Sequence, residues 1–297
     1  MAPHNTMSGI VVGVDDSPAA TAAVDWAARD AELRNVPLTL VHAISPTLAT
    51  WWDTPLPPGL AQWQKEHGRR LLDDAVKVAE AARGSAGPAQ IHTELFSSAA
   101  IPTLVDLSKD AVLLVTGSRS GDGWRGRLLG SVASALVRHA RCPVAVIHDD
   151  DSLMAQPAQA PVLVGVDGSS ASEPATAIAF DEASRRNVGL IAMHSWSDGD
   201  VSEWPDADWP ATQSMAEQVL AERLAGWQEQ YPDVNVRRIV ARDQPARQIV
   251  EHSKEAQLLV VGSRGRGGFG EMLVGSVSET VAQLARTPVI VARQSHA

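Results

Sequence analysis

The stretch VVGSRGRGG, residues 260–268, decides the fold of this chain, and the pair Gly275-Ser276 follows ten residues after Gly265. Its valines end an apolar run, its glycines favour a loop, and Ser276 stands where a helix can begin. A buried strand, a glycine-rich loop and a helix N-terminus together form a cradle of backbone N–H groups that suits phosphate. The stretch therefore predicts an α/β fold with an anion-binding loop.

The chain contains two copies of one pattern. IVVGVDDSPAATAAVDWAARDAELRNVPLTLVHA, from residue 10, aligns with VLVGVDGSSASEPATAIAFDEASRRNVGLIAMHS, from residue 162, at a constant offset of 152. Further along, LSKDAVLLVTGSRS aligns with HSKEAQLLVVGSRG at an offset of 145, so Gly117-Ser118 matches Gly262-Ser263. A register that holds at both ends indicates a duplicated domain.

Each copy alternates short apolar runs with helical patterns. Val11–Val14 is β-rich, and Ser17-Pro18 supplies a cap and a first-turn proline for the helix that follows. Near-continuous Val/Leu strands alternating with helices are typical of parallel sheets covered on both faces. We therefore expect two tandem Rossmann-like domains, each a five-stranded parallel sheet with helices on both faces. Domain 1 spans 1–150, starting near residue 8, a linker spans 151–161, and domain 2 spans 162–297.

Composition restricts the possible partners. The net charge is −10 without basic runs, which argues against nucleic-acid binding. No apolar run approaches the roughly 18 residues that a membrane span needs, and the first eight residues do not resemble a secretion signal. The single cysteine, Cys142, suits a reducing compartment. We expect a cytoplasmic protein with no membrane span and no nucleic-acid partner.

The spacing Gly-x-x-Gly, nine residues, Gly-Ser is complete in the second copy, where Ser276 can also cap the helix. In the first copy Ser120 replaces the second glycine. If that position requires a positive φ, a side chain there costs about 1 kcal/mol. Gly121 and Gly123 follow at once and would let the loop re-form. We expect two occupied sites, with the second one tighter.

Other residues fall beside these loops because ligands of doubly wound sheets bind beyond the carboxyl ends of the strands. Asp15 and Asp167 follow the first strand of each copy and are expected to contact the ligand, whereas Asp16 is expected to be solvated. Arginines in or near the loops add local positive charge: Arg119, Arg125, Arg127, Arg264 and Arg266.

These motifs resemble the universal stress protein family, and the resemblance to the two-domain members of mycobacteria covers nearly the whole chain. It implies ATP, with or without Mg²⁺, as the ligand, and a homodimer as the assembly. It places Gly165 and Asp167 beside the ribose and base, and Ser195 with the loop to Asp198 near the adenine. Around ribose and phosphates it places Gly262, Ser263, Gly265, Gly267, Gly275, Ser276 and Val277. The first-copy counterparts are Gly13, Asp15, Ala43, Gly117, Gly130, Ser131 and Val132, with Ser118 beside them.

Other activities lack their usual parts in the sequence. An acidic pair like Asp15-Asp16 also occurs in phosphoacceptor receiver domains, but the acceptor Asp and the Lys of that class are missing. His42 and His194 stand without a second ligand at metal spacing, so we expect them to order a loop or touch a base. The glycine loops contain no lysine, so rapid phosphoryl transfer is not expected. We expect no catalytic residues and no metal site.

The favoured function is therefore a nucleotide-dependent regulator of the stress response, read by another protein. It would be non-catalytic or a very slow ATPase. The alternative is an adenine-nucleotide hydrolase or adenylate-forming enzyme of the wider α-hydrolase-like class. That class needs a Ser-Gly-Gly-type loop after the first strand, and Asp167-Gly168-Ser169 is a poor match.

Overall fold

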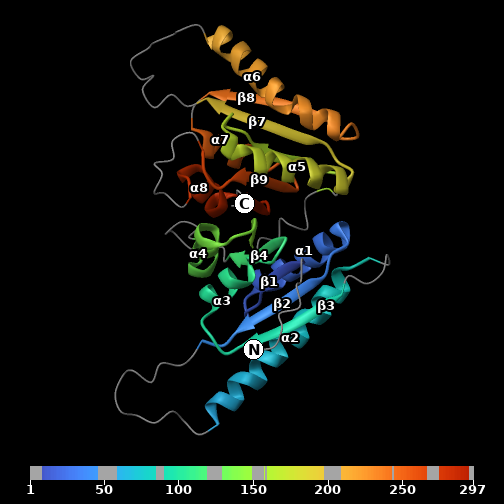
Figure 1. The fold of residues 1–297 in the computed structure, drawn as a ribbon, viewed down its shortest axis with the longest axis vertical. Coiled ribbons are helices and arrows are strands. Elements are labelled where there is room, and N and C mark those ends of the chain that lie inside the picture. The colour runs from blue at the N-terminus through green and yellow to red at the C-terminus, as the bar shows by residue number, and fades with distance from the viewer. Residues whose placement is uncertain are drawn as a thin grey trace. The chain divides into compact units, whose positions relative to one another are not determined.

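The computed structural model describes residues 9–45, 59–84, 90–118, 129–148, 157, 159–196, 209–242, 244–265 and 274–293 (Figure 1). The described residues up to His148 form one compact unit, and those from Pro157 onward form a second. Two units agree with the duplicated pattern of the sequence. The boundaries at 150, 151–161 and 162 stay a prediction, because most of the linker lies outside the described residues.

The first unit is a parallel sheet of five strands in the order β3-β2-β1-β4-β5. The chain leaves β1 in one direction to build β2 and β3, then returns to add β4 and β5 on the other side. The switch point therefore lies between β1 and β4. Its elements are β1 (Ile10–Gly13), α1 (Pro18–Arg34), β2 (Leu38–Ala43), α2 (Leu60–Ala82), β3 (Ile91–Phe96), α3 (Ala100–Leu107), β4 (Leu113–Ser118), α4 (Ser131–His139) and β5 (Val144–His148).

The second unit repeats this order, with all neighbouring strands parallel: β8-β7-β6-β9-β10. Its switch point lies between β6 and β9. Its elements are β6 (Val162–Gly165), the 3₁₀ turn η2 (Ser170–Ser172), α5 (Glu173–Arg186), β7 (Leu190–Trp196), α6 (Trp209–Gln230), β8 (Val236–Arg242), α7 (Pro245–Ser253), β9 (Leu258–Gly262), α8 (Ser276–Leu284) and β10 (Val289–Ala292). The predicted fold class is confirmed.

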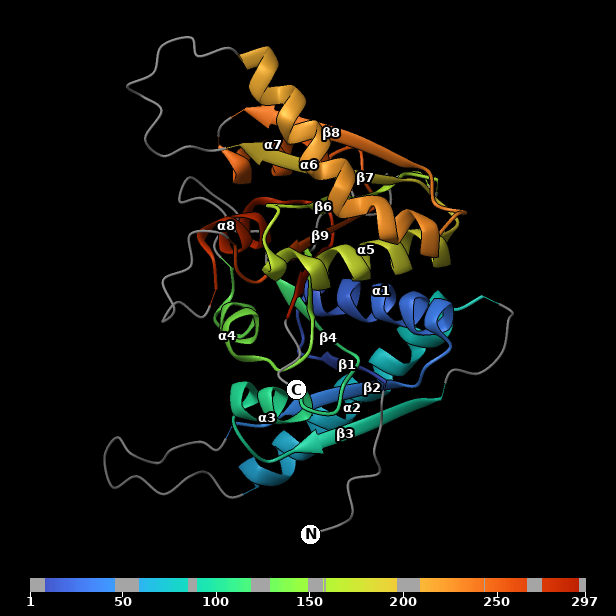
Figure 2. The same cartoon turned by 45° about the horizontal axis from the view of Figure 1, so that its top comes forward.

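Helices cover both faces of each sheet, which explains why the central strands are apolar throughout. In the first unit α1 packs with α2, and α3 packs with α4. In the second unit α7 packs with α8, and Figure 2 shows α5 and α6 on the same face of the sheet, in front of the strands. Strand residues such as Val12, Leu114 and Leu163 are fully buried as a result.

Local signals set the ends of the first helix in each unit. Ser17 is the N-cap of α1, and its Oγ accepts a hydrogen bond from the Ala20 N–H at 3.1 Å. Asn35 and Asn187 end α1 and α5 in the left-handed conformation, both with φ of 52°. The second unit differs at the start, where η2 precedes α5 and no side chain caps the helix. The connection after β6 therefore contains a 3₁₀ turn that the one after β1 lacks.

Candidate functional site

Those predicted residues that the structure describes gather near the switch point of each sheet. In the second unit, β6 and β9 are adjacent, with Val164 paired to Val260. The loop after β6 carries Asp167, and the loop after β9 begins at Gly262, so the two loops leave the same edge of the sheet. In the first unit Val12 pairs with Val115, and Asp15 and Gly117 take the corresponding places. The topology thus brings together residues that lie about a hundred positions apart in the sequence.

Asp167 lies between the two loops of the second unit. Its Oδ1 accepts hydrogen bonds from the backbone N–H of Ser169 at 2.9 Å and from the Ser169 Oγ at 2.7 Å. Its Oδ2 faces the glycine loop, because a Cβ atom built on Gly265 would lie 2.6 Å from it. Gly168, with a φ of 77°, supplies the turn that places Asp167 there. One carboxylate oxygen is therefore fixed by the turn and the other faces the loop.

Asp15 is held in the same way in the first unit. The Ser17 N–H donates to Asp15 Oδ1 at 3.0 Å, and the Ser17 Oγ donates to the same oxygen. The adjacent Asp16 is exposed, as expected for a solvated residue. Asp-x-Ser in both copies is the local signal for this turn. The predicted site contained the aspartates but omitted Ser17 and Ser169, which hold them.

The glycine loop of the second unit is closed at its base by hydrogen bonds. The Gly275 N–H donates to the Ser263 carbonyl at 2.8 Å, and the Ser263 N–H donates to the Ala292 carbonyl at 2.8 Å. The Ser278 Oγ donates to the Gly262 carbonyl. These bonds fix the end of β9 against the beginning of α8. The N-terminus of α8 is therefore held at the sheet edge that carries Asp167.

Gly275 and Gly130, rather than the serines that follow them, are the N-caps of α8 and α4. The predicted capping role of Ser276 is wrong, because Ser276 is already the first helical residue. Neither glycine provides a side-chain cap for the first-turn N–H groups. A Cβ atom built on Gly130 would have no neighbour within 4 Å, so none of the described residues fills the space in front of the α4 N-terminus. Both helix starts suit an anion.

The first glycine of each motif has a different role from the one predicted. A Cβ at Gly117 would lie 2.5 Å from the backbone C and O atoms of Ala19, in the first turn of α1. A Cβ at Gly262 would lie 3.0 Å from the Ala171 carbonyl oxygen. These glycines are needed because a neighbouring backbone passes close by, whether or not phosphate binds.

Several other predicted residues serve packing around the site. Gly13 and Gly165 leave room for the helices that cover them. A Cβ at Gly13 would lie 3.1 Å from Leu104 of α3, and a Cβ at Gly165 would lie 3.0 Å from Ile249 of α7. The side chains of Ser118 and Ser263 are buried, so these hydroxyls point into the domain. Half-buried or exposed at the site edge are Ala43, Ser131, Val132, Ser195, Arg264, Ser276 and Val277. Outside the described residues lie Arg119, Ser120, Gly121, Gly123, Arg127, Asp198, Arg266 and Gly267.

The two repeated histidines bind the protein backbone. The Nδ1 atoms of His42 and His194 lie 2.7 Å from the carbonyl oxygens of Val14 and Val166, the residues that precede Asp15 and Asp167. This geometry agrees with the predicted loop-ordering role. Within the described ranges, no group of three or more His, Cys, Asp or Glu side chains could hold a metal ion.

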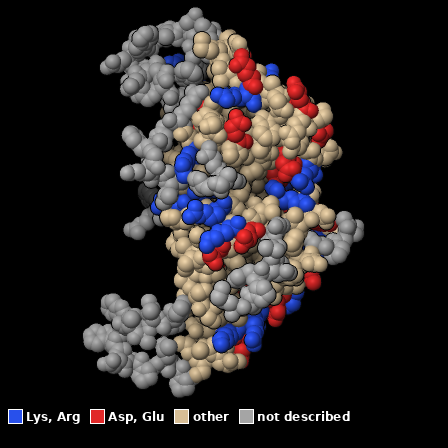
Figure 3. Space-filling view, in the orientation of Figure 1, with Lys and Arg blue, Asp and Glu red and all other residues tan. Residues whose placement is uncertain are grey.

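Side chains of both signs lie on the surface of each unit in the face drawn in Figure 3. None of the helices in the described part of the chain combines the length and apolar character that a membrane crossing requires.

Comparisons with known proteins agree with this architecture. The sequence profile of the universal stress protein family matches residues 7–148 and again residues 160–293. Universal stress protein Rv2623 of Mycobacterium tuberculosis (strain ATCC 25618 / H37Rv) is 70% identical over 295 residues, covering 99% of each chain. Universal stress protein Mb2028c of Mycobacterium bovis is 54% identical, over 99% of this chain and all of that one.

A solved structure shares the fold of the whole chain. A universal stress protein from Archaeoglobus fulgidus DSM 4304 matches with a TM-score of 0.69 and 21% identity, over 97% of this chain and 98% of that one. The expected resemblance to two-domain mycobacterial proteins is confirmed by the full-length relatives. The chain therefore belongs to the universal stress protein family, with two family domains in tandem.

Proposed function

We propose that the protein binds ATP at the switch point of each domain. The observation that carries the proposal is the position of Asp167, with one oxygen fixed by Ser169 and the other facing the glycine loop at Gly265. An acidic side chain at the carboxyl edge of the sheet accepts hydrogen bonds from ribose hydroxyls in Rossmann-type sites. The start of α8, on the other side of that loop, offers N–H groups to phosphate. One site thus meets both ends of a nucleotide.

The described residues fit such a ligand chemically. Gly275 and Gly130 cap their helices without a side chain, and no described residue lies within 4 Å of a Cβ atom built on Gly130. The carboxylates of Asp15 and Asp167 are on short side chains, and each is fixed by a hydrogen bond from the backbone N–H two residues later. Family resemblance supports ATP as the nucleotide, with or without Mg²⁺.

Binding without efficient turnover follows from the loop sequences. Residues 117–130 and 262–275 contain no lysine, so no P-loop ammonium neutralises charge on a transferred phosphoryl group. We therefore propose a nucleotide-dependent regulator of stress adaptation in the cytoplasm, at most a very slow ATPase. A homodimer is part of the proposal, and light scattering of the purified chain at several concentrations tests it.

Mass spectrometry of nucleotide released from the purified full-length chain tests the ligand. We expect ATP at a ratio approaching two per chain after saturation, and a ratio near one if Ser120 disables the first site. No bound nucleotide, even after incubation with excess ATP, would contradict the proposal.

A matched pair of substitutions locates the site. Gly265→Ser gives the second loop the residue of the first, and its Cβ would meet Asp167 Oδ2. The φ of Gly265 is not positive, so the added side chain acts through this contact and not through backbone strain. We expect several-fold weaker ATP binding by calorimetry, and a five-fold loss corresponds to about 1 kcal/mol. Ser120→Gly gives the first loop the residue of the second and should strengthen binding there. Asp167→Asn keeps a turn acceptor but removes the charge, so it separates loss of charge from loss of the turn.

A further inference from the structure

A side-chain hydrogen bond joins the end of the second strand to the residue before the site aspartate in each domain. Val166 lies one position beyond the last residue of β6. Its N–H donates to the Met193 carbonyl at 2.8 Å, and its carbonyl lies 2.7 Å from His194 Nδ1. Because a carbonyl oxygen can only accept, Nδ1 must carry the proton. Both polar groups of Val166 are therefore held by β7, the N–H by its backbone and the carbonyl by a side chain.

The first domain has the same arrangement. The Val14 N–H donates to the Val41 carbonyl at 2.8 Å, and the Val14 carbonyl accepts from His42 Nδ1 at 2.7 Å. The repeat of a donor, an acceptor and a distance in two separately folded units indicates a requirement of the fold. The helix opposite is adapted to the ring as well, because a Cβ at Gly68 in α2 would lie 2.9 Å from His42 Cδ2.

We propose that His42 and His194 are positioning residues for the nucleotide sites, acting through Val14 and Val166 on Asp15 and Asp167. This inference rests on the proposed nucleotide binding. The bond from the histidine Nδ1 extends the pairing between the first and second strands of each domain by one residue, to the valine just after the first strand. The aspartate then starts its turn from a fixed backbone carbonyl, and the serine two residues later binds its Oδ1. The chain of contacts runs from histidine to valine to aspartate to serine.

A direct contact between histidine and the base is the rival role. His194 is only 4% exposed, and its Nδ1 is already bound to Val166. The burial of the ring therefore favours positioning over contact with a ligand.

The pair His194→Asn and His194→Leu tests the inference in the full-length chain. Asn carries an N–H on the atom bonded to Cγ, as His carries Nδ1, whereas Leu has a similar branched shape and no donor. We expect His194→Asn to keep ATP affinity within about three-fold and His194→Leu to lose about ten-fold, as for one unsatisfied buried carbonyl. Equal losses in both variants would overturn positioning and support base contact. Unchanged affinity in both would overturn any role.

A measurement without nucleotide separates this inference from the proposed function. Hydrogen exchange of the Ser169 amide, which donates to Asp167, reports the turn in the nucleotide-free chain. We expect protection in the wild type and in His194→Asn, and faster exchange in His194→Leu. This result would support positioning of Asp167 even if ATP failed to bind. Unaltered exchange in His194→Leu would overturn the inference, and the Ser17 amide of the first domain serves as the internal control for folding.

Discussion

The helices α1 and α2 of domain 1 pack through small side chains, whereas α5 and α6 of domain 2 pack through large ones. In domain 1, Ala28 on α1 and Ala79 on α2 are almost completely buried, and the two helices approach closely. In domain 2 the residue equivalent to Ala28 is Phe180, whose ring centroid lies 6.2 Å from that of Trp227 on α6, and α5 and α6 approach far less closely. Tyr231, just after α6, adds a third ring 5.7 Å from Phe180.

This difference separates what duplication preserved from what it left free. The aspartate, the serine and the histidine keep their identity in both domains because each makes a specific hydrogen bond. Core positions between helices changed because several combinations of small and large side chains fill an interior equally well. The domains are therefore alike in the residues that hold the site aspartate and different in the helix layer that covers the sheet.

Truncating the aromatic core should have the largest effect. Phe180 is fully buried, so Phe180→Ala should lower the free energy of unfolding of domain 2 by about 3–5 kcal/mol. Ala28→Phe, which adds the ring to domain 1, should cost about 1–3 kcal/mol through overpacking. Urea unfolding combined with hydrogen exchange resolves each domain. A loss below about 1 kcal/mol in Phe180→Ala would show that the ring does not set the helix spacing.

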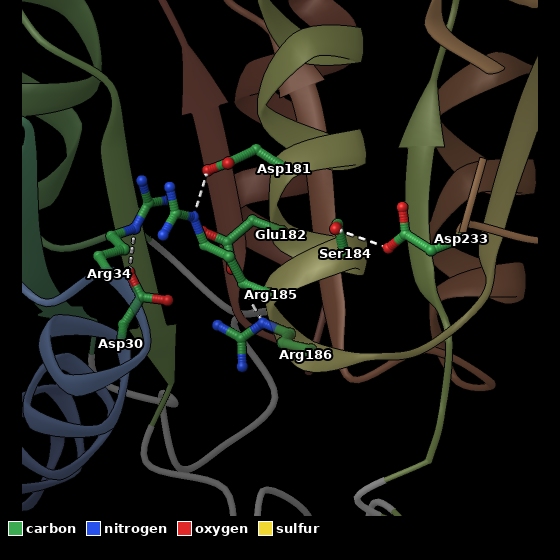
Figure 4. Close-up of polar contacts among 8 residues, drawn as sticks. All are labelled: Asp30, Arg34, Asp181, Glu182, Ser184, Arg185, Arg186 and Asp233. Atoms are coloured by element: carbon green, nitrogen blue, oxygen red, sulfur yellow. Dashed lines mark hydrogen bonds and ion pairs between the residues drawn. The ribbon is translucent and has the colours of Figure 1, made fainter. Parts of the chain in front are cut away.

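Each domain has an equivalent buried ion pair on its first helix, and removing either pair should destabilise its domain by a similar amount. Arg186 binds Glu182 at 2.9 Å with the two side chains 12% and 0% exposed, and Arg34 binds Asp30 at 2.8 Å with 12% and 1% (Figure 4). Removing one partner of a buried pair leaves an uncompensated charge, so Arg186→Met and Arg34→Met should each cost about 3 kcal/mol.

The neighbouring Arg185 provides the control for that prediction. Arg185 binds Asp181 at 2.8 Å with the two side chains 38% and 29% exposed. Arg185→Met should cost less than about 1 kcal/mol in thermal unfolding, because water screens this pair. Equal losses for Arg185→Met and Arg186→Met would contradict the importance of burial.

Substituting the first motif glycine should destabilise domain 1 more than domain 2. Gly117→Ala places a Cβ 2.5 Å from the backbone of Ala19 and should destabilise domain 1 by about 1–3 kcal/mol. Gly262→Ala meets the Ala171 carbonyl oxygen at 3.0 Å, a smaller displacement, and should cost less. Calorimetric unfolding of both variants without nucleotide tests the order. The reverse order would indicate that α1 yields more easily than η2.

The smallest expected effect is a pH dependence confined to domain 2. Burial, and after it the nearby Asp181 carboxylate, raises the pKa of the Tyr231 hydroxyl above its usual value near 10. Because the pKa of Tyr231 is higher in the folded than in the unfolded domain, the protonated hydroxyl contributes to the free energy of unfolding. This contribution is complete below pH 10 and is lost as the pH rises through the pKa of the folded state. The residue after α2 is Arg83, so domain 1 has no tyrosine at the end of this helix. Tyr231→Phe should flatten the alkaline loss of stability of domain 2 and leave domain 1 unchanged.

Most of the fold could be predicted from the sequence because the signals were local and occurred twice. Val/Leu runs, the Ser17-Pro18 helix start and the constant offsets gave the strands, helices and duplication, and all agree with the structure. Among the described residues, the aspartates and the first motif glycines lie at the switch points, since the carboxyl ends of parallel strands share one edge. Whether those positions bind ATP stays a prediction.

The sequence by itself determined the fold, the duplication and the edge of the sheet where the site residues gather, because periodicity and spacing encode them along the chain. Only the tertiary structure decided what each site residue does. Gly117 is required by the backbone of α1, Gly265 by the Asp167 carboxylate, and Gly275 rather than Ser276 caps α8. These roles depend on distances between segments far apart in sequence, and no local pattern carries a distance.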